Sequence, residues 1–164
     1  MSASDHESVP DPARLAAWRA LLNAHAAAVG AIERDLATAG LAPLTWYDVL
    51  FALAEAPEGR LRLHELADRV VLSRSGLTRL VDRLEGAGLL FREACPTDRR
   101  GAYAVLSAEG KAILRRMWPA YARGIVAYFA RYVSEEEAGA LTAVLGRVAM
   151  GDTEALRDEA AARG

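Results

Sequence analysis

Two short helical patterns followed at once by a hairpin pattern constrain the fold of this chain more than any other feature. Residues 63–72 (LHELADRVVL) and 73–87 (SRSGLTRLVDRLEGA) both place apolar side chains at helical spacing. The segments 89–94 and 102–107 then read as two strands joined by a turn. The buried stripe of the second helix is expected at Leu77, Leu80, Val81 and Leu84.

This order of elements is typical of a winged helix, in which the second helix can enter a major groove of DNA and the hairpin tip lies along the backbone or in a minor groove. The fold class is therefore predicted to be mainly α with a small β-hairpin wing. The segment RLRL at residues 60–63 is expected to be a short strand or a turn.

The region before the winged helix is predicted to be helical. Asp11 is a good N-cap with Pro12 at the first helical position, Gly40 closes the helix, and Thr45 is expected to cap a further helix over 45–56. The first helix carries an apolar seam at alternating spacings of three and four, which suits packing against another helix. The seam consists of Leu15, Trp18, Leu22, Val29, Ile32 and Leu36, with His25 at the missing step.

The region after the winged helix is also predicted to be helical. A long helix is expected over 107–133, kinked at Pro119, and a capping box of Ser134 and Glu137 begins a last helix that ends near residue 150. The last helix has an apolar stripe of its own at Leu141, Val144, Leu145 and Val148. Both stripes need a cover, which a second copy of the chain or a helical bundle within one chain would supply.

Length and composition favour one globular domain without a membrane span, because no run of eighteen apolar residues is uninterrupted. A single cysteine and the absence of a secretory signal suit a cytoplasmic protein. The expected organisation is a flexible tail at 1–10, a single domain at 11–150 with the winged helix at about 45–108 between terminal helices at about 11–39 and 108–150, and a C-terminal tail at 151–164.

Basic charge is concentrated in the predicted winged helix. Residues 60–100 hold nine arginines and six acidic residues, within a chain of net charge −2. Opposite its apolar stripe, the helix at 73–87 presents hydroxyls and arginines, side chains that reach base edges and phosphates. The residues on this face are Arg74, Ser75, Thr78, Arg79, Asp82 and Arg83. The alternative is a winged helix used for protein–protein contact, in which the arginines serve an acidic partner. In that case the outer face of the helix at 73–87 is expected to be acidic or apolar.

The stretch from residue 66 to 110 resembles the MarR family of winged-helix transcription regulators. The family signature Asp-x-Arg, five residues, Leu-(Thr/Ser)-x-x-Gly is matched by Asp98, Arg100, Leu106, Ser107 and Gly110. The resemblance implies that Arg100 enters a minor groove, that Asp98 braces it, and that Arg99 contacts phosphate. It places the recognition positions on Ser73, Arg74, Ser75, Thr78 and Arg79.

The resemblance also implies a homodimer joined through the N- and C-terminal helices, and a pseudo-palindromic operator in double-stranded DNA. It implies a repressor that a small aromatic or phenolic ligand releases from DNA. Residues that could line a ligand pocket are Trp18, His25, Trp46, Tyr47, Trp118 and Tyr121, although aromatic residues at helical spacing are also ordinary core residues.

Cys95 offers a redox-responsive alternative, since neighbouring arginines lower a thiol pKa, but a structural or incidental cysteine is the favoured interpretation. The three histidines are isolated from other metal ligands in the sequence, so no metal or other cofactor is expected. Without a nucleophile motif or a glycine-rich phosphate loop, the sequence predicts no enzymatic activity.

Overall fold

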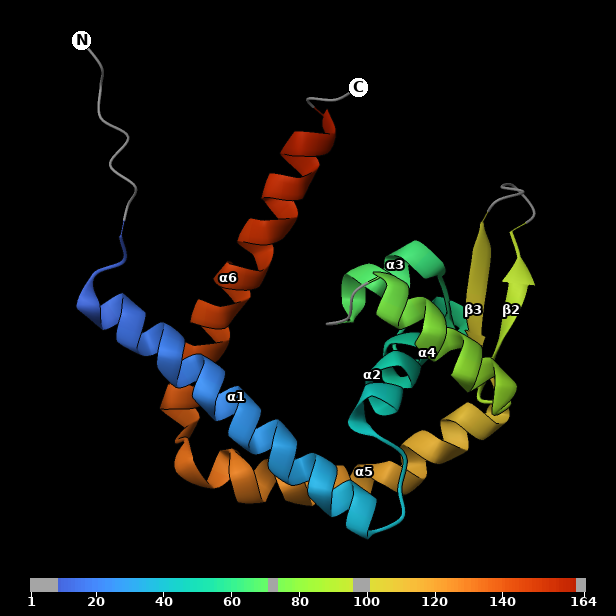
Figure 1. Cartoon of the computed structure of the whole chain (residues 1–164), viewed down its shortest axis with the longest axis horizontal. Helices are drawn as coiled ribbons and strands as arrows, with labels where there is room; N and C mark the ends of the chain where they lie inside the picture. The colour runs from blue at the N-terminus through green and yellow to red at the C-terminus, as the bar shows by residue number, and fades with distance from the viewer. Residues whose placement is uncertain (1–8, 71–73, 96–100, 162–164) are drawn as a thin grey trace. The chain divides into compact units, whose positions relative to one another are not determined.

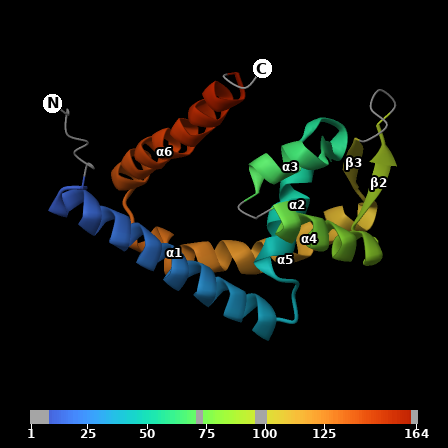
Figure 2. The same cartoon turned by 45° about the horizontal axis from the view of Figure 1, so that its top comes forward.

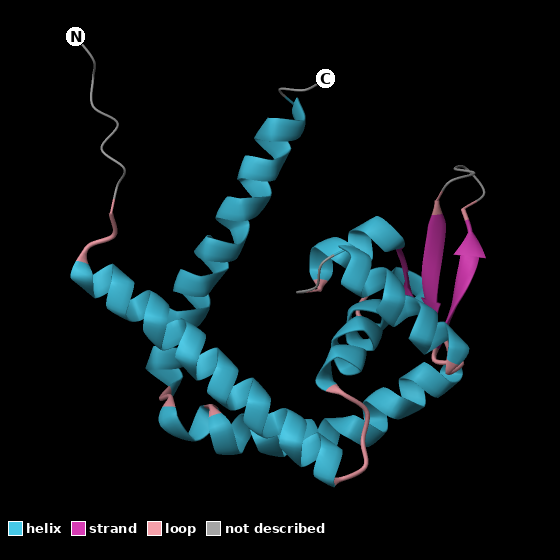
Figure 3. Cartoon of the chain, in the orientation of Figure 1, coloured by secondary structure: helices cyan, strands magenta, loops and turns pink. Residues whose placement is uncertain are grey.

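The computed structural model describes residues 9–70, 74–95 and 101–161. It is largely helical with one three-stranded antiparallel sheet, which confirms the predicted fold class (Figure 3). Contacts within the chain divide it into two compact units, residues 1–125 and residues 126–164.

The winged helix lies in the first unit, and its elements are coloured from cyan to yellow in Figure 1. The three strands pair in the order β1-β3-β2, so RLRL contributes a true strand to the sheet. Figures 1 and 2 both show the β2–β3 hairpin beside α3 and α4. The elements are α2 (Leu44–Ala54), β1 (Arg60–Arg62), α3 (Leu63–Arg69), α4 (Arg74–Gly86), β2 (Leu90–Ala94) and β3 (Ala102–Leu106).

The predicted stripe of α4 is buried, and it forms part of one hydrophobic core. Leu77, Leu80, Val81 and Leu84 are all at most 3% exposed. They belong to a cluster with Leu50 and Leu53 of α2 and Leu90 of β2. Burying a leucine side chain stabilises a fold by roughly 1.5–3 kcal/mol, so this stripe fixes α4 with its opposite face outward.

The first helix, α1 (Pro12–Thr38), begins as predicted, because the Asp11 side chain accepts a hydrogen bond of 2.9 Å from the Arg14 backbone N–H. Its seam is divided, however. Ile32 and Leu36 are buried in the core of the first unit, whereas Trp18 and Leu22 are 55% and 48% exposed. Of the two covers left open by the sequence, packing within one chain covers the C-terminal end of the seam, where Ile32 lies against Gly124, while the N-terminal end stays exposed.

The exposed apolar side chains of α1 have another consequence. By length and composition alone, α1 could cross a membrane, and 11% of its most apolar stretch is buried within the chain. The sequence analysis did not anticipate this property. It arises from the alanines and leucines between Leu15 and Val29, an apolar surface that the described residues leave largely exposed.

Two predicted helix boundaries are wrong. Thr45 does not cap α2, because the helix already begins at Leu44, whose backbone N–H donates to Glu33 Oε1 at 2.9 Å. The cap thus comes from α1 rather than from the local sequence. The α3 helix ends at Arg69 instead of residue 72, since Val70 adopts an extended conformation and is buried.

The helix α5 (Ala108–Tyr128) starts on a tight set of contacts formed by Ser107 and Gly110. The Ser107 hydroxyl donates to the Gly88 carbonyl at 2.7 Å and accepts from the Gly110 N–H at 2.9 Å. A Cβ atom on Gly110 would lie 2.2 Å from the Leu89 carbonyl oxygen. The Leu-Ser-x-x-Gly half of the sequence motif therefore joins α5 to the turn after α4.

The C-terminal helices differ in length from the prediction. Pro119 lies inside α5, which continues to Tyr128 and stops before 133 because Phe129 leaves helical geometry ahead of a short 3-10 turn, Ala130–Tyr132. In the second unit, the capping box of Ser134 and Glu137 is confirmed by two hydrogen bonds. The last helix, α6 (Glu135–Ala161), runs past residue 150, since the following segment is rich in helix-forming Ala, Glu, Leu and Arg.

Candidate nucleic-acid interface

The exposed face of α4 carries the polar residues that the sequence singles out. Ser75, Thr78 and Arg79 are exposed on the side opposite the buried stripe, followed by Asp82 and Arg83. Arg74 is the first residue of α4, and Ser73 lies outside the described residues. The helix therefore offers hydroxyl and guanidinium groups in its N-terminal half, the part of a recognition helix that reaches base edges.

The wing is a paired hairpin that holds the ends of its turn together. Ala94 of β2 pairs with Ala102 of β3, and the Cys95 N–H donates to the Gly101 carbonyl at 3.1 Å. The predicted groove residues Asp98, Arg99 and Arg100 lie between these positions, outside the described residues. Pairing on both sides fixes where the turn leaves and re-enters the sheet.

Arg92 links the wing to α4, a role that the sequence analysis missed. Its guanidinium donates to Asp82 Oδ1 at 2.5 Å and also to the Glu85 carboxylate, and its backbone N–H donates to Glu85 Oε1 at 2.9 Å. Desolvation alone would lower the pKa of Arg92, but these carboxylates raise it above its ordinary value. A charged residue at an inward strand position was the available signal, because such a residue needs partners.

The opposite face of the sheet holds two further arginines against an aromatic ring. The guanidinium carbons of Arg60 and Arg62 lie 5.2 and 5.7 Å from the centroid of the Tyr103 ring. Arg60 also pairs with Glu58 at 2.6 Å. These contacts stabilise the base of the wing by cation–π attraction.

Cys95 follows β2 at the start of the hairpin turn, where it is 5% exposed. Arg62 Nη2 donates to the Cys95 sulfur at 3.5 Å. Among the described residues, the cation in contact with this thiol is therefore an arginine of β1. Reactive cysteines need both thiolate character and access to solvent. The burial of Cys95 therefore favours its structural interpretation.

An open groove between α2 and α5 is lined by two of the six predicted pocket residues, Tyr47 and Trp118, and a third, Tyr121, contacts both of their rings. The Tyr121 ring meets two other rings edge-on, with centroid distances of 5.0 Å to Tyr47 and 6.2 Å to Trp118. The Phe51 ring stacks on the Tyr47 ring at a centroid distance of 5.6 Å. Burial raises the pKa of both Tyr47 and Tyr121 above its ordinary value. The groove encloses about 500 Å³ and is lined by Tyr47, Phe51, Ala54, Lys111, Leu114, Arg115 and Trp118.

The other three predicted pocket residues lie elsewhere. Trp46 packs against the hydrophobic core and does not line this groove. Trp18 and His25 are exposed on the N-terminal part of α1. The sequence reasoning grouped aromatic residues by type, and only tertiary packing separates the ones that share a groove.

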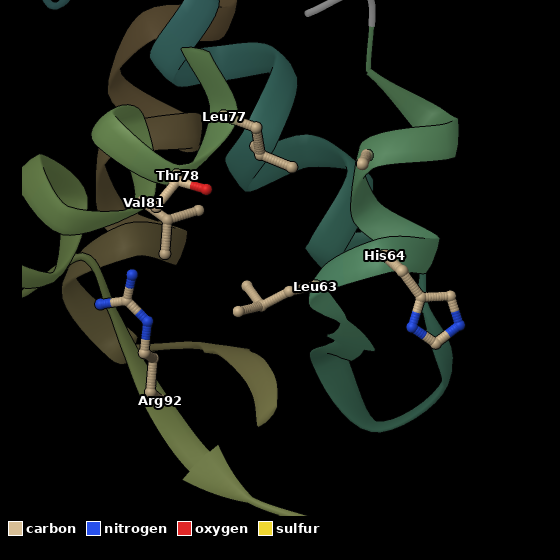
Figure 4. Close-up of a pocket in the computed structure, with 7 residues that line it drawn as sticks. Leu63, His64, Leu77, Thr78, Val81 and Arg92 are labelled. Carbon is tan, nitrogen blue, oxygen red and sulfur yellow. The ribbon is translucent and has the colours of Figure 1, made fainter. Parts of the chain in front are cut away.

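A smaller cavity of about 190 Å³ lies between α3, α4 and β2. Figure 4 shows Leu63 and Val81 directed toward it, with Thr78 and Arg92 at one side and His64 at the other. It is below the usual size of ligand sites, which is roughly 300–1,000 Å³. Among the residues that the structure describes, no group of three or more His, Cys, Asp or Glu could hold a metal ion.

Comparison with known proteins places this geometry in context. A family model described as the MarR family matches residues 39–101. Sco3205, a MarR family transcriptional regulator from Streptomyces coelicolor solved in complex with DNA, is 32% identical, and the match covers 90% of this chain and 92% of that one with a TM-score of 0.80.

Curated relatives match over a shorter stretch. The transcriptional regulator MhqR of Bacillus subtilis is 35% identical over 88 residues, which are 54% of this chain and 60% of MhqR. The homoprotocatechuate degradative operon repressor of Escherichia coli is 33% identical over 97 residues, which are 59% of this chain and 64% of the repressor. The matched stretch thus spans less than two thirds of either relative.

Proposed function

The chain belongs to the MarR family of transcriptional regulators, and from this premise we propose that it binds double-stranded DNA sequence-specifically as a homodimer. The observation that carries the proposal is the outward face of α4, where Ser75, Thr78 and Arg79 stand beside a paired wing. The similar Streptomyces regulator was solved with DNA, which supports the same use of these elements here.

In the proposed complex, α4 enters the major groove and the wing reaches the neighbouring minor groove. Arg79 would read a guanine edge, since two N–H groups of a guanidinium match its O6 and N7 acceptors. Arg99 and Arg100, which lie in the sequence between β2 and β3, would meet phosphate and the narrow minor groove. Two copies of α4 in a two-fold dimer read a pseudo-palindromic site with half-sites about one helical turn apart.

The alternative of a protein-binding winged helix fits α4 less well. Its exposed face is neither apolar nor acidic, and its one central acidic residue, Asp82, is paired with Arg92. Base edges and phosphates use both hydroxyl and guanidinium side chains.

Selection of bound sequences from a random duplex pool tests the proposal, and substitutions in α4 then test the contacts. We expect Arg79→Ala and Thr78→Ala each to cost about 1–3 kcal/mol of binding free energy at the selected operator and less on unrelated duplex. The exposed α5 residue Arg116 gives a control of equal charge change, Arg116→Ala. Equal losses on both duplexes would reduce Arg79 and Thr78 to phosphate contacts.

We further propose that the chain is a repressor released from DNA by a small aromatic or phenolic ligand held in the α2–α5 groove. The groove joins an aromatic wall to two cations, Lys111 and Arg115, which suit an aromatic ring with an anionic or hydroxyl substituent. Because the groove lies on α2 and α5, a ligand there contacts helices that pack directly against the winged-helix core.

Trp118→Leu is expected to weaken binding of phenol or benzoate about tenfold, since it removes one of the three aromatic rings that line the groove. Trp18→Leu is the matched control, because Trp18 is similarly exposed and lies outside the groove. Calorimetric titration of both variants provides the measurement. Equal effects of the two substitutions would assign the ligand to a different place.

A further inference from the structure

Arg92 is a charged residue on the core-facing side of its strand. In β2 it alternates with the buried Leu90, and its cross-strand partner is the buried Ala104. The Arg92 side chain is itself only 29% exposed. An apolar side chain would occupy such a position without the desolvation of a guanidinium group. The fold alone therefore gives no reason for an arginine here.

Among the described residues, both side-chain partners of Arg92 lie on α4. Asp82 and Glu85 are three positions apart, so their carboxylates are neighbours on the helix surface and one planar guanidinium reaches both. The Arg92 backbone N–H adds a third bond, to Glu85. The chain itself connects α4 to β2 through residues 87–89. Arg92 supplies a second connection, closer to the turn of the wing.

These bonds join the two elements that the proposed function brings to DNA. We call the bonds from Arg92 to Asp82 and Glu85 the Arg92 clamp. Its α4 end lies on the turn that follows Thr78 and Arg79. Its β2 end, Arg92, is three residues before Cys95, where the hairpin turn begins. Simultaneous contact with a major and a minor groove requires a fixed offset between helix and wing. A clamp at this point sets that offset.

We propose that Arg92 is a positioning residue for DNA binding, which holds the wing strand β2 in register with the recognition helix α4. The inference rests on the proposed function, since it assigns to Arg92 an effect on DNA that does not pass through direct contact. Charge alone predicts something different. If Arg92 only offset the two carboxylates against phosphate repulsion, any cation at this position would serve.

Two substitutions separate geometry from charge. Arg92→Met fits the core-facing position but removes every side-chain bond to α4, and Arg92→Lys keeps the charge but replaces the planar fork with a single ammonium group. Arg60→Met is the matched control, because Arg60 stands on β1 and also pairs with two carboxylates, those of Glu58 and Glu93. The full-length chain is used throughout.

The measurements are affinity for the operator selected from a random duplex pool, affinity for an unrelated duplex over a salt series, and urea unfolding. We expect Arg92→Met and Arg92→Lys both to weaken operator binding by roughly tenfold or more, with a smaller loss on the unrelated duplex. The salt dependence should keep its slope, since no phosphate contact is removed. The unfolding midpoint of both Arg92 variants should remain close to that of the wild type. Arg60→Met, which loses the stabilising contact with Tyr103, should leave operator affinity and the salt slope unchanged.

Each of the following results would contradict one of the claims made for Arg92 or for DNA binding. Operator affinity of Arg92→Lys equal to the wild type would leave a charge effect and no positioning role. A salt slope flatter by about one unit per subunit would make Arg92 a phosphate contact. Normal operator binding by Arg92→Met would overturn the inference while leaving the proposed function intact. Failure of the wild type to enrich any duplex would overturn both. If Arg92→Met does not fold, Arg92→Lys carries the comparison.

Discussion

Replacement of Gly110 by alanine is expected to cost the winged-helix unit about 3 kcal/mol or more of unfolding free energy. The added Cβ would lie 2.2 Å from the Leu89 carbonyl oxygen and 2.6 Å from Leu106 Cδ1. The closest of these atoms is backbone, held in place by Ser107, so the contact cannot be relieved by rotating a side chain. Urea unfolding followed by circular dichroism provides the measurement.

Gly86→Ala is the matched control for this prediction. Gly86 is helical, and a Cβ atom there would meet nothing within 4 Å. We expect this variant to be within about 1 kcal/mol of the wild type, on the stabilising side, because alanine is the better helix former. Wild-type stability of Gly110→Ala would show that the start of α5 does not lie against the turn at Leu89.

Leu22→Glu is expected to convert the proposed homodimer into a monomer at micromolar concentration and to abolish tight operator binding. Leu22 is half-exposed on α1 beside other apolar side chains, and a carboxylate buried there against a second copy would lack a partner. Loss of the dimer separates the two half-site contacts, so binding falls with it. Sedimentation and titration of operator duplex measure the two effects.

Asn23→Glu provides the control, since it adds the same charge at the adjacent exposed position of the same helix. Ile32, which belongs to the same heptad seam, is unsuitable as a dimer probe. It is 5% exposed, and its side chain lies against Gly124 of α5 within the same chain. A dimeric Leu22→Glu variant with normal operator affinity would remove α1 from the interface.

Local patterns predicted the elements that depend on local physics. The stripe of α4, the Asp11 cap and the Ser134–Glu137 capping box follow from side-chain spacing within one or two turns, and all three are confirmed. The start of α2 was mispredicted because Glu33, eleven residues away, accepts the N–H of Leu44. No local pattern around Thr45 contains that contact.

The candidate interface also has one part that the local sequence predicts and one part that depends on tertiary packing. The outward face of α4 follows from the buried stripe on its other side, so the sequence alone indicates it. The Arg92 clamp requires the register of β2 against β3 and the closeness of α4, which are tertiary facts. The same holds for the groove, which unites Tyr47 and Trp118 from helices that are far apart in the chain.

Because one end of α1 is buried and the other is exposed, this helix fixes the distance and the angle between its exposed side chains and the core. Its 27 residues form a rod of roughly 40 Å, with its C-terminal end embedded in the core of the winged-helix unit and its N-terminal end exposed. Adding or removing one residue between Leu22 and Ile32 would turn the exposed side chains by about 100° about the helix axis relative to the embedded end. The number of residues between those two ends is thus as constrained as their identity, and length variation should accumulate at the chain termini instead.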